Sequence, residues 1–385
     1  MISLALQLFL ASTSAGTKSP PPYVNRLDWC ASASTTIEEP CTLPVRFSPD
    51  ASRALIGERD AVWWVVADRL SLIARVGEDG WTGLCCAIQT PLEPINDTGL
   101  AGITVRVPHM RRAILDVTHR AERMPPPIDI RGPDAPPPPA KAEPLRGVIT
   151  SISIESVALR EKRRINIYLP PDLAEGQRLP VIYLADGDTA GFAPLAEAAT
   201  AGGRAAPAII VGIESGRGPM EGCGQGPCDR RMLEYLLDVN PTGAQTNTLF
   251  GRHLRFVTDE LIPYIEKHYP ASHRREDRVT AGYSNGGAWA LAASEARPDL
   301  FGKVLAMSSG SKAAAENAGR LKDAQLYAGA GLFEPGFLKK TEQAVEVARA
   351  AGAKAVMRTM IAGHSRSMWH ILFVDGIAWL LPPRT

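Results

Sequence analysis

The amino-acid sequence predicts an α/β fold, with a doubly wound and mostly parallel sheet that follows a small all-β, sandwich-like domain. Three observations lead to this prediction. Strand and helix patterns alternate over residues 145–385, short β-like runs fill residues 17–124, and a proline-rich segment, residues 125–144, lies between them. A length of 385 residues also suits two domains better than one.

The first 16 residues read MISLALQLFLASTSAG, a short apolar stretch followed by small residues. This pattern is typical of a signal peptide cleaved after Ala15, although no Lys or Arg precedes the apolar core. The stretch is shorter than the roughly 20 apolar residues that span a bilayer, and no other segment reaches that length. We therefore expect an exported protein, periplasmic or extracellular, without a membrane span.

The six cysteines form an even number, which fits a compartment in which disulfides persist. A short-range bridge between Cys223 and Cys228 is expected in the loop GCGQGPC, with free thiols as the alternative. Cys30 and Cys41 are candidates for a second pair. No metal site is expected, because neither a CxxC motif nor clustered histidines lie near the glycine-rich loop.

The first region, residues 17–124, is rich in Val, Ile and Trp with Gly, Asp, Asn and Pro between the apolar runs, which favours a small antiparallel sandwich. Its runs are AVWWVVA, LSLIARV, TGLCCAIQ, GITVRV and RAILDV. His109 and His119 are isolated there, so surface or packing roles are expected. The next segment, residues 125–144, holds nine prolines in 20 positions and favours an extended, semi-rigid linker.

The second region alternates buried strands with amphipathic helices, which predicts parallel strands joined by helical crossovers. RRINIYLP alternates apolar and polar residues, as a half-buried edge strand does. The other strand candidates are LPVIYLADG, APAIIVGI, RVTAGYS, KVLAMSS, AQLYAGA and AVMRTMIAG. Helices are expected over LRFVTDELIPYIEKHY, GGAWALAASEA and TEQAVEVARAAG. Ligands of such sheets bind beyond the carboxyl ends of the strands, so the polar residues there are the candidates for a site.

Composition argues against several function classes. Lys plus Arg number 42 and Asp plus Glu 41, so the net charge of +1 provides no basic surface for nucleic acid or an anionic membrane. Apolar residues make up 45% and charged residues 22%, which is ordinary for a globular protein. We expect a small-molecule substrate.

Ser284 lies in GYSNG, which matches G-x-S-x-G between a predicted strand and a predicted helix. This is the setting of a nucleophile elbow, in which a sharp turn displays the serine and the glycines relieve crowding. A structural serine in a tight connection is the alternative. A nucleophilic serine needs a base oriented by an acid. In folds with such an elbow the acid follows the serine in the sequence, and the histidine follows the acid.

His364 is the favoured base because it follows an apolar strand, whereas His370 lies inside a predicted helix. Glu334 is the favoured acid because it follows the strand AQLYAGA in a Gly- and Pro-containing loop. Asp323, Asp299 and Asp375 are less well placed: Asp323 precedes that strand, Asp299 follows the nucleophile helix, and Asp375 comes after His364.

An oxyanion hole is expected from backbone N–H groups. The first donor is the N–H of Asn285, directly after the serine, and the second is the N–H of Gly187 or Asp188 in the loop that ends VIYLADGD. The sequence SGSK at residues 309–312 matches S-x-x-K, but no K-T-G follows it, so we do not expect a penicillin-recognising enzyme.

Six separated elements, in order along residues 147–382, resemble the putative-esterase family of α/β hydrolases, which includes siderophore (enterochelin) esterases, S-formylglutathione hydrolases, feruloyl esterases and mycolyltransferases. The elements are LREKRRINIYLPPDL, LPVIYLADGD, RRMLEYL, DELIPYIEKHYP with AGYSNGGAWAL, GLFEPGFLKKT and GHSRSMWHILF. The acid-bearing loop is similar to that of the siderophore-esterase branch. The family's glycine pair before the histidine is Ala362-Gly363 here.

The resemblance implies an α/β-hydrolase fold with Ser284 as nucleophile, Glu334 as acid and His364 as base. RRMLEYL is similar to the family's R-x-x-E element, which places Arg231 at the substrate, and we also expect Trp289 to contact it. We therefore expect a serine hydrolase that cleaves a carboxylic ester, siderophore-type or otherwise bulky, without a cofactor. The alternatives are an acyltransferase using the same acyl-enzyme, and a non-catalytic envelope binding protein on an esterase scaffold.

Overall fold

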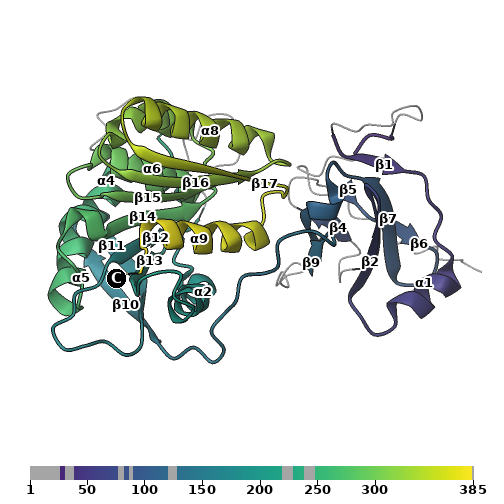
Figure 1. Ribbon diagram of the computed structural model, residues 1–385, viewed down its shortest axis with the longest axis horizontal. Coiled ribbons are helices and arrows are strands. Elements are labelled where there is room, and N and C mark those ends of the chain that lie inside the picture. The colour runs from purple at the N-terminus through teal and green to yellow at the C-terminus, as the bar shows by residue number, and fades with distance from the viewer. Residues whose placement is uncertain are drawn as a thin grey trace, which may run out of the picture. The chain divides into compact units, whose positions relative to one another are not determined.

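The computed structural model describes residues 27–30, 39–76, 82–85, 90–119, 128–218, 229–237 and 248–383. The chain divides into two compact units (Figure 1). Unit 1 comprises Met1–Met110 with Val117–Ile128, and unit 2 comprises Arg111–Asp116 with Asp129–Thr385. None of the described helices combines the length and the apolar character needed to cross a membrane.

Unit 1 is built on an antiparallel sheet of order β1-β7-β3-β2, in which β6 also pairs with β7. Its strands are β1 (Cys41–Leu43), β2 (Ala61–Val66), β3 (Arg69–Arg75), β6 (Glu93–Ile95) and β7 (Leu100–Arg106). A second sheet has the order β5-β4-β8-β9, with β4 (Thr82–Cys85) and β5 (Thr90–Pro91) in unit 1 and with β8 (Ile114–His119) and β9 (Ile128–Arg131) each divided between the two units. The small β domain that the sequence predicts is confirmed. Strand β9 lies within the proline-rich segment.

Unit 1 also contains a disulfide and a short helix. Cys30 and Cys41 form a disulfide, as the sequence suggested; Cys223 and Cys228 lie outside the described residues. Helix α1 (Pro49–Ile56) was not expected, although Pro49 at its first turn and Gly57 at its end are ordinary helix boundary signals. A single helix of eight residues does not alter the β-rich character of the unit.

Unit 2 contains an eight-stranded sheet of order β10-β11-β13-β12-β14-β15-β16-β17. The strands from β13 to β17 run parallel, and β10 and β11 are antiparallel to their neighbours. The predicted doubly wound, mostly parallel sheet is therefore confirmed. The strands are β10 (Val148–Ser156), β11 (Glu161–Leu169), β12 (Val181–Ala185), β13 (Ile209–Ile213), β14 (Arg278–Tyr283), β15 (Lys303–Met307), β16 (Gln325–Gly331) and β17 (Lys354–Met360).

Helices cover both faces of this sheet (Figure 1). Successive residues of β12 point to opposite faces, so Val181 and Tyr183 enter one apolar core and Ile182 and Leu184 the other. Helices α2 (Thr189–Ala201) and α9 (Arg366–Leu380) pack into the second core. The first core receives α4 (Leu249–Arg255), α5 (Ile262–His268), α6 (Asn285–Ala296), α7 (Lys312–Asn317) and α8 (Pro335–Ala350), and the short α3 (Arg230–Tyr235) also packs there.

The structure corrects the predicted edge of the sheet. We expected RRINIYLP to form an edge strand, but β11 is the second strand and β10 lies outside it. The alternation in β11 has another origin, because buried Arg163 on one face is held by an ion pair with Glu234. The predicted long helix from residue 254 to residue 269 is also interrupted, since Phe256–Leu261 forms π-helical turns that end two residues before Pro263.

Candidate active site

Ser284 occupies a sharp turn between the carboxyl end of β14 and the start of α6. Its φ of 56° and ψ of −128° lie in a region that residues with a Cβ seldom adopt. The neighbouring glycines make this turn possible. A Cβ at Gly282 would lie 2.3 Å from the carbonyl oxygen of Gly286, and a Cβ at Gly286 would lie 2.9 Å from Asp186 Oδ2. The turn therefore has the geometry predicted for a nucleophile elbow.

The structure brings together the three residues that the sequence singled out. His364 lies in the loop between β17 and α9, with its Nε2 2.9 Å from Ser284 Oγ and its Nδ1 2.5 Å from Glu334 Oε2. An ionised carboxylate only accepts hydrogen bonds, so the Nδ1–H donates to Glu334. Nε2 is then left as the acceptor for the hydroxyl proton of Ser284. The arrangement can remove a proton from the serine without moving any of the three side chains.

Glu334 is held by contacts that the sequence did not predict. Its side chain is buried between β16 and α8, and its Oε1 accepts hydrogen bonds from Ser308 Oγ at 2.7 Å and from the Gly331 N–H at 2.6 Å. Ser308 in turn accepts a hydrogen bond of 2.9 Å from Trp369 Nε1. Because Oε1 is engaged in this way, the carboxylate presents Oε2 to His364. Trp369 lies in the quoted segment GHSRSMWHILF, but no signal in the sequence marked Ser308.

Aromatic rings fix the plane of the His364 imidazole. The Phe337 ring stacks on it with centroids 4.2 Å apart, and Trp369 meets it edge-on at 4.8 Å. Trp369 also stacks on Tyr283 at 4.3 Å, next to the serine. The His364 side chain is 19% exposed, so its neighbours cover most of the imidazole. Apolar packing and hydrogen bonding therefore hold the ring in the same orientation.

The predicted oxyanion donors lie at the carboxyl ends of two neighbouring parallel strands, β12 and β14. Asn285 is the first residue of α6, and Gly187, with a φ of 69°, lies in the turn before α2. Asp188 is at the N-cap position of α2. Within the described part of the chain, the backbone N–H groups of Gly187, Asp188 and Asn285 have no acceptor. None of the three groups is thus committed to another contact there.

The two residues expected to contact substrate have different positions. Arg231, in α3, forms a two-pronged ion pair with Asp186, and its side chain is 25% exposed. Trp289 is fully buried in the core against Tyr235 and His253, so the prediction that it contacts the substrate is wrong. Its ring contacts with Tyr235 and His253 place the indole in the packing between helices.

The remaining candidates lie elsewhere. His370 is in α9 and half-buried, and burial lowers its pKa to about 4, so it stays neutral near pH 7. Asp299 pairs with Arg297, and Asp375 pairs with Arg204. Among the residues that the structure describes, no group of three His, Cys, Asp or Glu side chains is arranged to hold a metal ion.

A protein-family model described as "Putative esterase" matches residues 156–380. The match covers more than half of the 385 residues and includes Ser284, Glu334 and His364. The chain belongs to this family. The match and the relatives of this esterase identify it as a carboxylic ester hydrolase.

One relative of this esterase is the iron(III) enterobactin esterase of Dickeya dadantii (strain 3937), 26% identical over 382 residues, covering 92% of this chain and 74% of the relative. Among solved structures, the enterobactin esterase FES of Shigella flexneri superposes with a TM-score of 0.65 at 17% identity, covering 84% of this chain and 96% of that one. An IroE-like serine hydrolase from Shewanella oneidensis superposes with a TM-score of 0.50 at 24% identity, covering 61% of this chain and 80% of that one. These structural likenesses support the α/β-hydrolase fold.

The buried side chain of His253 should make the stability of the folded protein depend on pH. It is fully buried beside Trp289, neither ring nitrogen has a hydrogen-bond partner among the described residues, and burial lowers its pKa to about 4. The charge of Glu234 opposes this shift, and Arg163 and Arg230 add to it. Between pH 6.5 and 4 the unfolded chain binds the proton more readily, so stability is complete above pH 6.5 and falls below it. The full change corresponds to about 3 kcal/mol.

We expect urea unfolding to show this loss between pH 7.5 and pH 4.5. His253→Phe should make the free energy of unfolding less dependent on pH over that range. His268→Gln is the matched control, because His268 is exposed, and it should leave the pH dependence unchanged. An unaltered pH dependence in His253→Phe contradicts the assignment.

Proposed function

We propose that the protein is a serine hydrolase that works through an acyl-enzyme, with Ser284 as nucleophile, His364 as general base and Glu334 as the orienting acid. The observation that carries this proposal is the continuous chain of hydrogen bonds from Glu334 Oε2 through His364 to Ser284 Oγ, at 2.5 and 2.9 Å. Hydrogen bonds of this length are suited to passing a proton between nucleophile and base.

In the first half of the reaction, Ser284 Oγ attacks the ester carbonyl carbon while its proton passes to His364 Nε2. The imidazolium that forms is stabilised by the carboxylate of Glu334. The carbonyl oxygen becomes an oxyanion, which the N–H groups of Asn285 and Gly187 (or Asp188) receive. Collapse of the tetrahedral intermediate breaks the bond to the leaving alkoxide, which takes the proton from His364 and departs as an alcohol.

In the second half, water attacks the acyl carbon of the acyl-enzyme and gives its proton to His364 Nε2. A second tetrahedral intermediate forms and collapses. The carboxylic acid is released and Ser284 Oγ recovers its proton from the imidazolium. The side chains of this chain supply every proton transfer in the sequence.

We further propose a siderophore-type ester as substrate. The support is the identity of 26% with an iron(III) enterobactin esterase along 92% of this chain, which takes in the N-terminal β-rich region as well as the hydrolase region. An enzyme that shared only the hydrolase scaffold would not need to align over both regions.

Export is a further proposal, supported by the Cys30–Cys41 disulfide in unit 1, since disulfides persist mainly outside reducing compartments. Fractionation of cells that express the full chain, with mass measurement of the isolated protein, should place it outside the cytoplasm with its N-terminus at Gly16. A full-length protein confined to the cytoplasm would contradict export.

The nucleophile assignment is tested with a fluorophosphonate probe, which should label the wild-type protein and fail to label Ser284→Ala. His364→Ala and Ser284→Ala should lower kcat by at least about 10⁴-fold, and Glu334→Gln by a smaller factor. His370→Phe is the control for the base and should retain turnover. Equal labelling of Ser284→Ala, or no labelling of the wild type, overturns the assignment; the second result favours a non-catalytic binding role.

The substrate assignment is tested by comparing kcat/KM for a catecholate trilactone, a feruloyl ester and a short-chain aryl ester. We expect the trilactone to be preferred by at least about tenfold, because remote contacts with a large substrate add transition-state binding. Adding glycerol or a sugar should leave the free acid as the product. A transesterified product would identify the enzyme as an acyltransferase instead.

A further inference from the structure

The loop Asp186-Gly187-Asp188 is tied to the protein by two arginines, one on each side of the glycine. Arg231 pairs with Asp186, and Arg366 pairs with Asp188 at an N···O distance of 2.8 Å. We propose that Arg231 and Arg366 are positioning residues that hold this loop so that the N–H of Gly187 points at the developing oxyanion. The proposal rests on the proposed function, because it assigns these arginines to its oxyanion hole and not to the substrate.

On one side of the glycine, α3 holds both the side chain and the backbone of Asp186. Arg231 donates through Nε to Oδ1 at 2.5 Å and through Nη2 to Oδ2 at 2.8 Å. Tyr235 OH accepts a hydrogen bond of 3.0 Å from the Asp186 N–H. Asp186 has a φ of 68°, an unfavourable conformation for a residue with a Cβ, and such conformations persist only where surrounding contacts maintain them. The two contacts from α3 supply that constraint.

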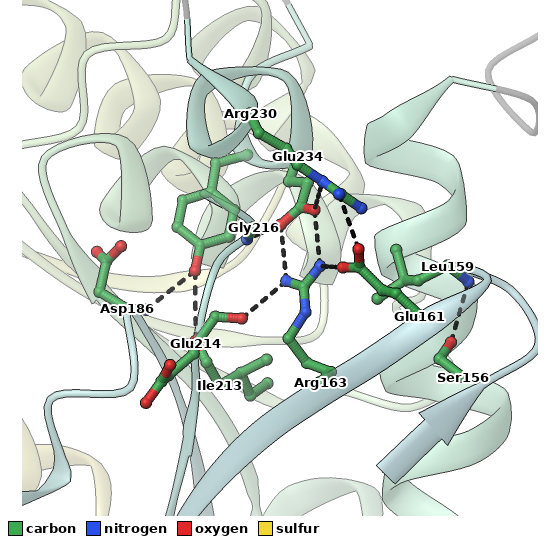
Figure 2. A network of polar contacts seen from close by, with 11 residues as sticks. Ser156, Leu159, Glu161, Arg163, Asp186, Ile213, Glu214, Gly216, Arg230 and Glu234 are labelled. Carbon is green, nitrogen blue, oxygen red and sulfur yellow. Dashed lines mark hydrogen bonds and ion pairs between the residues drawn. The ribbon is translucent and has the colours of Figure 1, made fainter. Parts of the chain in front are cut away.

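Helix α3 is itself anchored by buried charges (Figure 2). Glu234 is completely buried and receives both terminal nitrogens of Arg163, at 2.8 Å each, together with the Gly216 N–H at 2.8 Å. Arg230 adds an ion pair of 3.1 Å. Burial alone would raise the pKa of Glu234, but the hydrogen bond and charge of Arg163 prevail and lower it to about 2. A helix of six residues has little stability of its own, so these contacts determine the position of α3. They thereby fix the point from which the Arg231 side chain extends.

The other side of the loop is tied to the segment that carries His364. Arg366 is the first residue of α9, two positions after His364, and it pairs with Asp188. Between the two pairs, the Gly187 carbonyl accepts a hydrogen bond of 2.9 Å from Asn166 Nδ2. A Cβ at Gly187 would lie 2.5 Å from Glu214 Cγ, so the loop is closely packed. Within the described residues the N–H of Gly187 makes no hydrogen bond, and it is one of the two N–H groups of this loop that the proposed mechanism can use.

The experiment compares Arg231→Gln, Arg231→Lys, Arg366→Gln and Asp186→Asn, with Arg297→Gln as the control because Arg297 forms a surface pair with Asp299. The substrate is a small neutral ester such as p-nitrophenyl butyrate, which offers no charge for an arginine to bind. Removal of one oxyanion donor lowers kcat by about 10²- to 10³-fold, so a displaced donor should lower it by about 10- to 100-fold. KM should change less than twofold, and Arg231→Lys should recover part of the loss.

A boronic acid that forms a tetrahedral adduct with the serine provides the second measurement. Its affinity should fall by the same factor as kcat/KM in Arg231→Gln and Arg366→Gln, because it occupies the oxyanion hole as the transition state does. The thermal midpoint of each variant shows whether that variant is folded. If an arginine variant does not fold, Asp186→Asn is used in its place, because asparagine has nearly the same shape as aspartate.

Two outcomes overturn the proposal. A raised KM with unchanged kcat would make Arg231 a substrate contact, and unchanged kinetics with unchanged boronate affinity would leave the arginines without a role in the oxyanion hole. In both cases the wild type would still react with fluorophosphonate at Ser284. Failure of that reaction in the wild type would instead remove the proposed function itself.

Discussion

The hydrogen bond between His364 Nδ1 and Glu334 Oε2 sets the direction of the other polar contacts at the site. It places the ring proton on Nδ1 and leaves Nε2 facing Ser284. The carboxylate cannot turn away, because its second oxygen is engaged by Ser308 and by the Gly331 N–H. The imidazole cannot tilt, because the rings of Phe337 and Trp369 contact it. Glu334 and His364 are therefore held in place by contacts within the protein itself.

Glu334 and His364 come 50 and 80 positions after Ser284 in the sequence. The parallel sheet explains how the three residues come together at one edge. Ser284 follows β14, Glu334 follows β16, and His364 follows β17, so the carboxyl ends of three strands carry the whole arrangement. Strand β14 lies between β12 and β15 in the sheet. The loop after β12 therefore supplies Gly187 from the opposite side of the serine. The site is thus built from loops, while the strands beneath them are held by two apolar cores.

Much of this could be predicted from the sequence because the relevant signals are local. A buried apolar run followed by Gly-x-Ser-x-Gly reveals both a strand end and an elbow, and the order of Glu334 and His364 limits the candidates. The missed features depend on neighbours distant in sequence. Strand β10 alternates Ser, Thr and Glu with Ile, and its pairing with β11 makes it a strand. Trp289 reads as a ligand-facing aromatic until the helix packing that buries it is known. Arg231 is defined by its pairing with Asp186, which no spacing indicates.

The buried anchoring of α3 links two positions that lie far apart in the sequence. Arg163 belongs to β11 and Glu234 to α3, so the sheet fixes the helix, and Arg231 of the same helix then holds Asp186. Removing one partner of a buried ion pair leaves a charge without its counter-ion, which typically costs about 3–5 kcal/mol. Positions 163 and 234 are therefore expected to change together during evolution or to stay as they are.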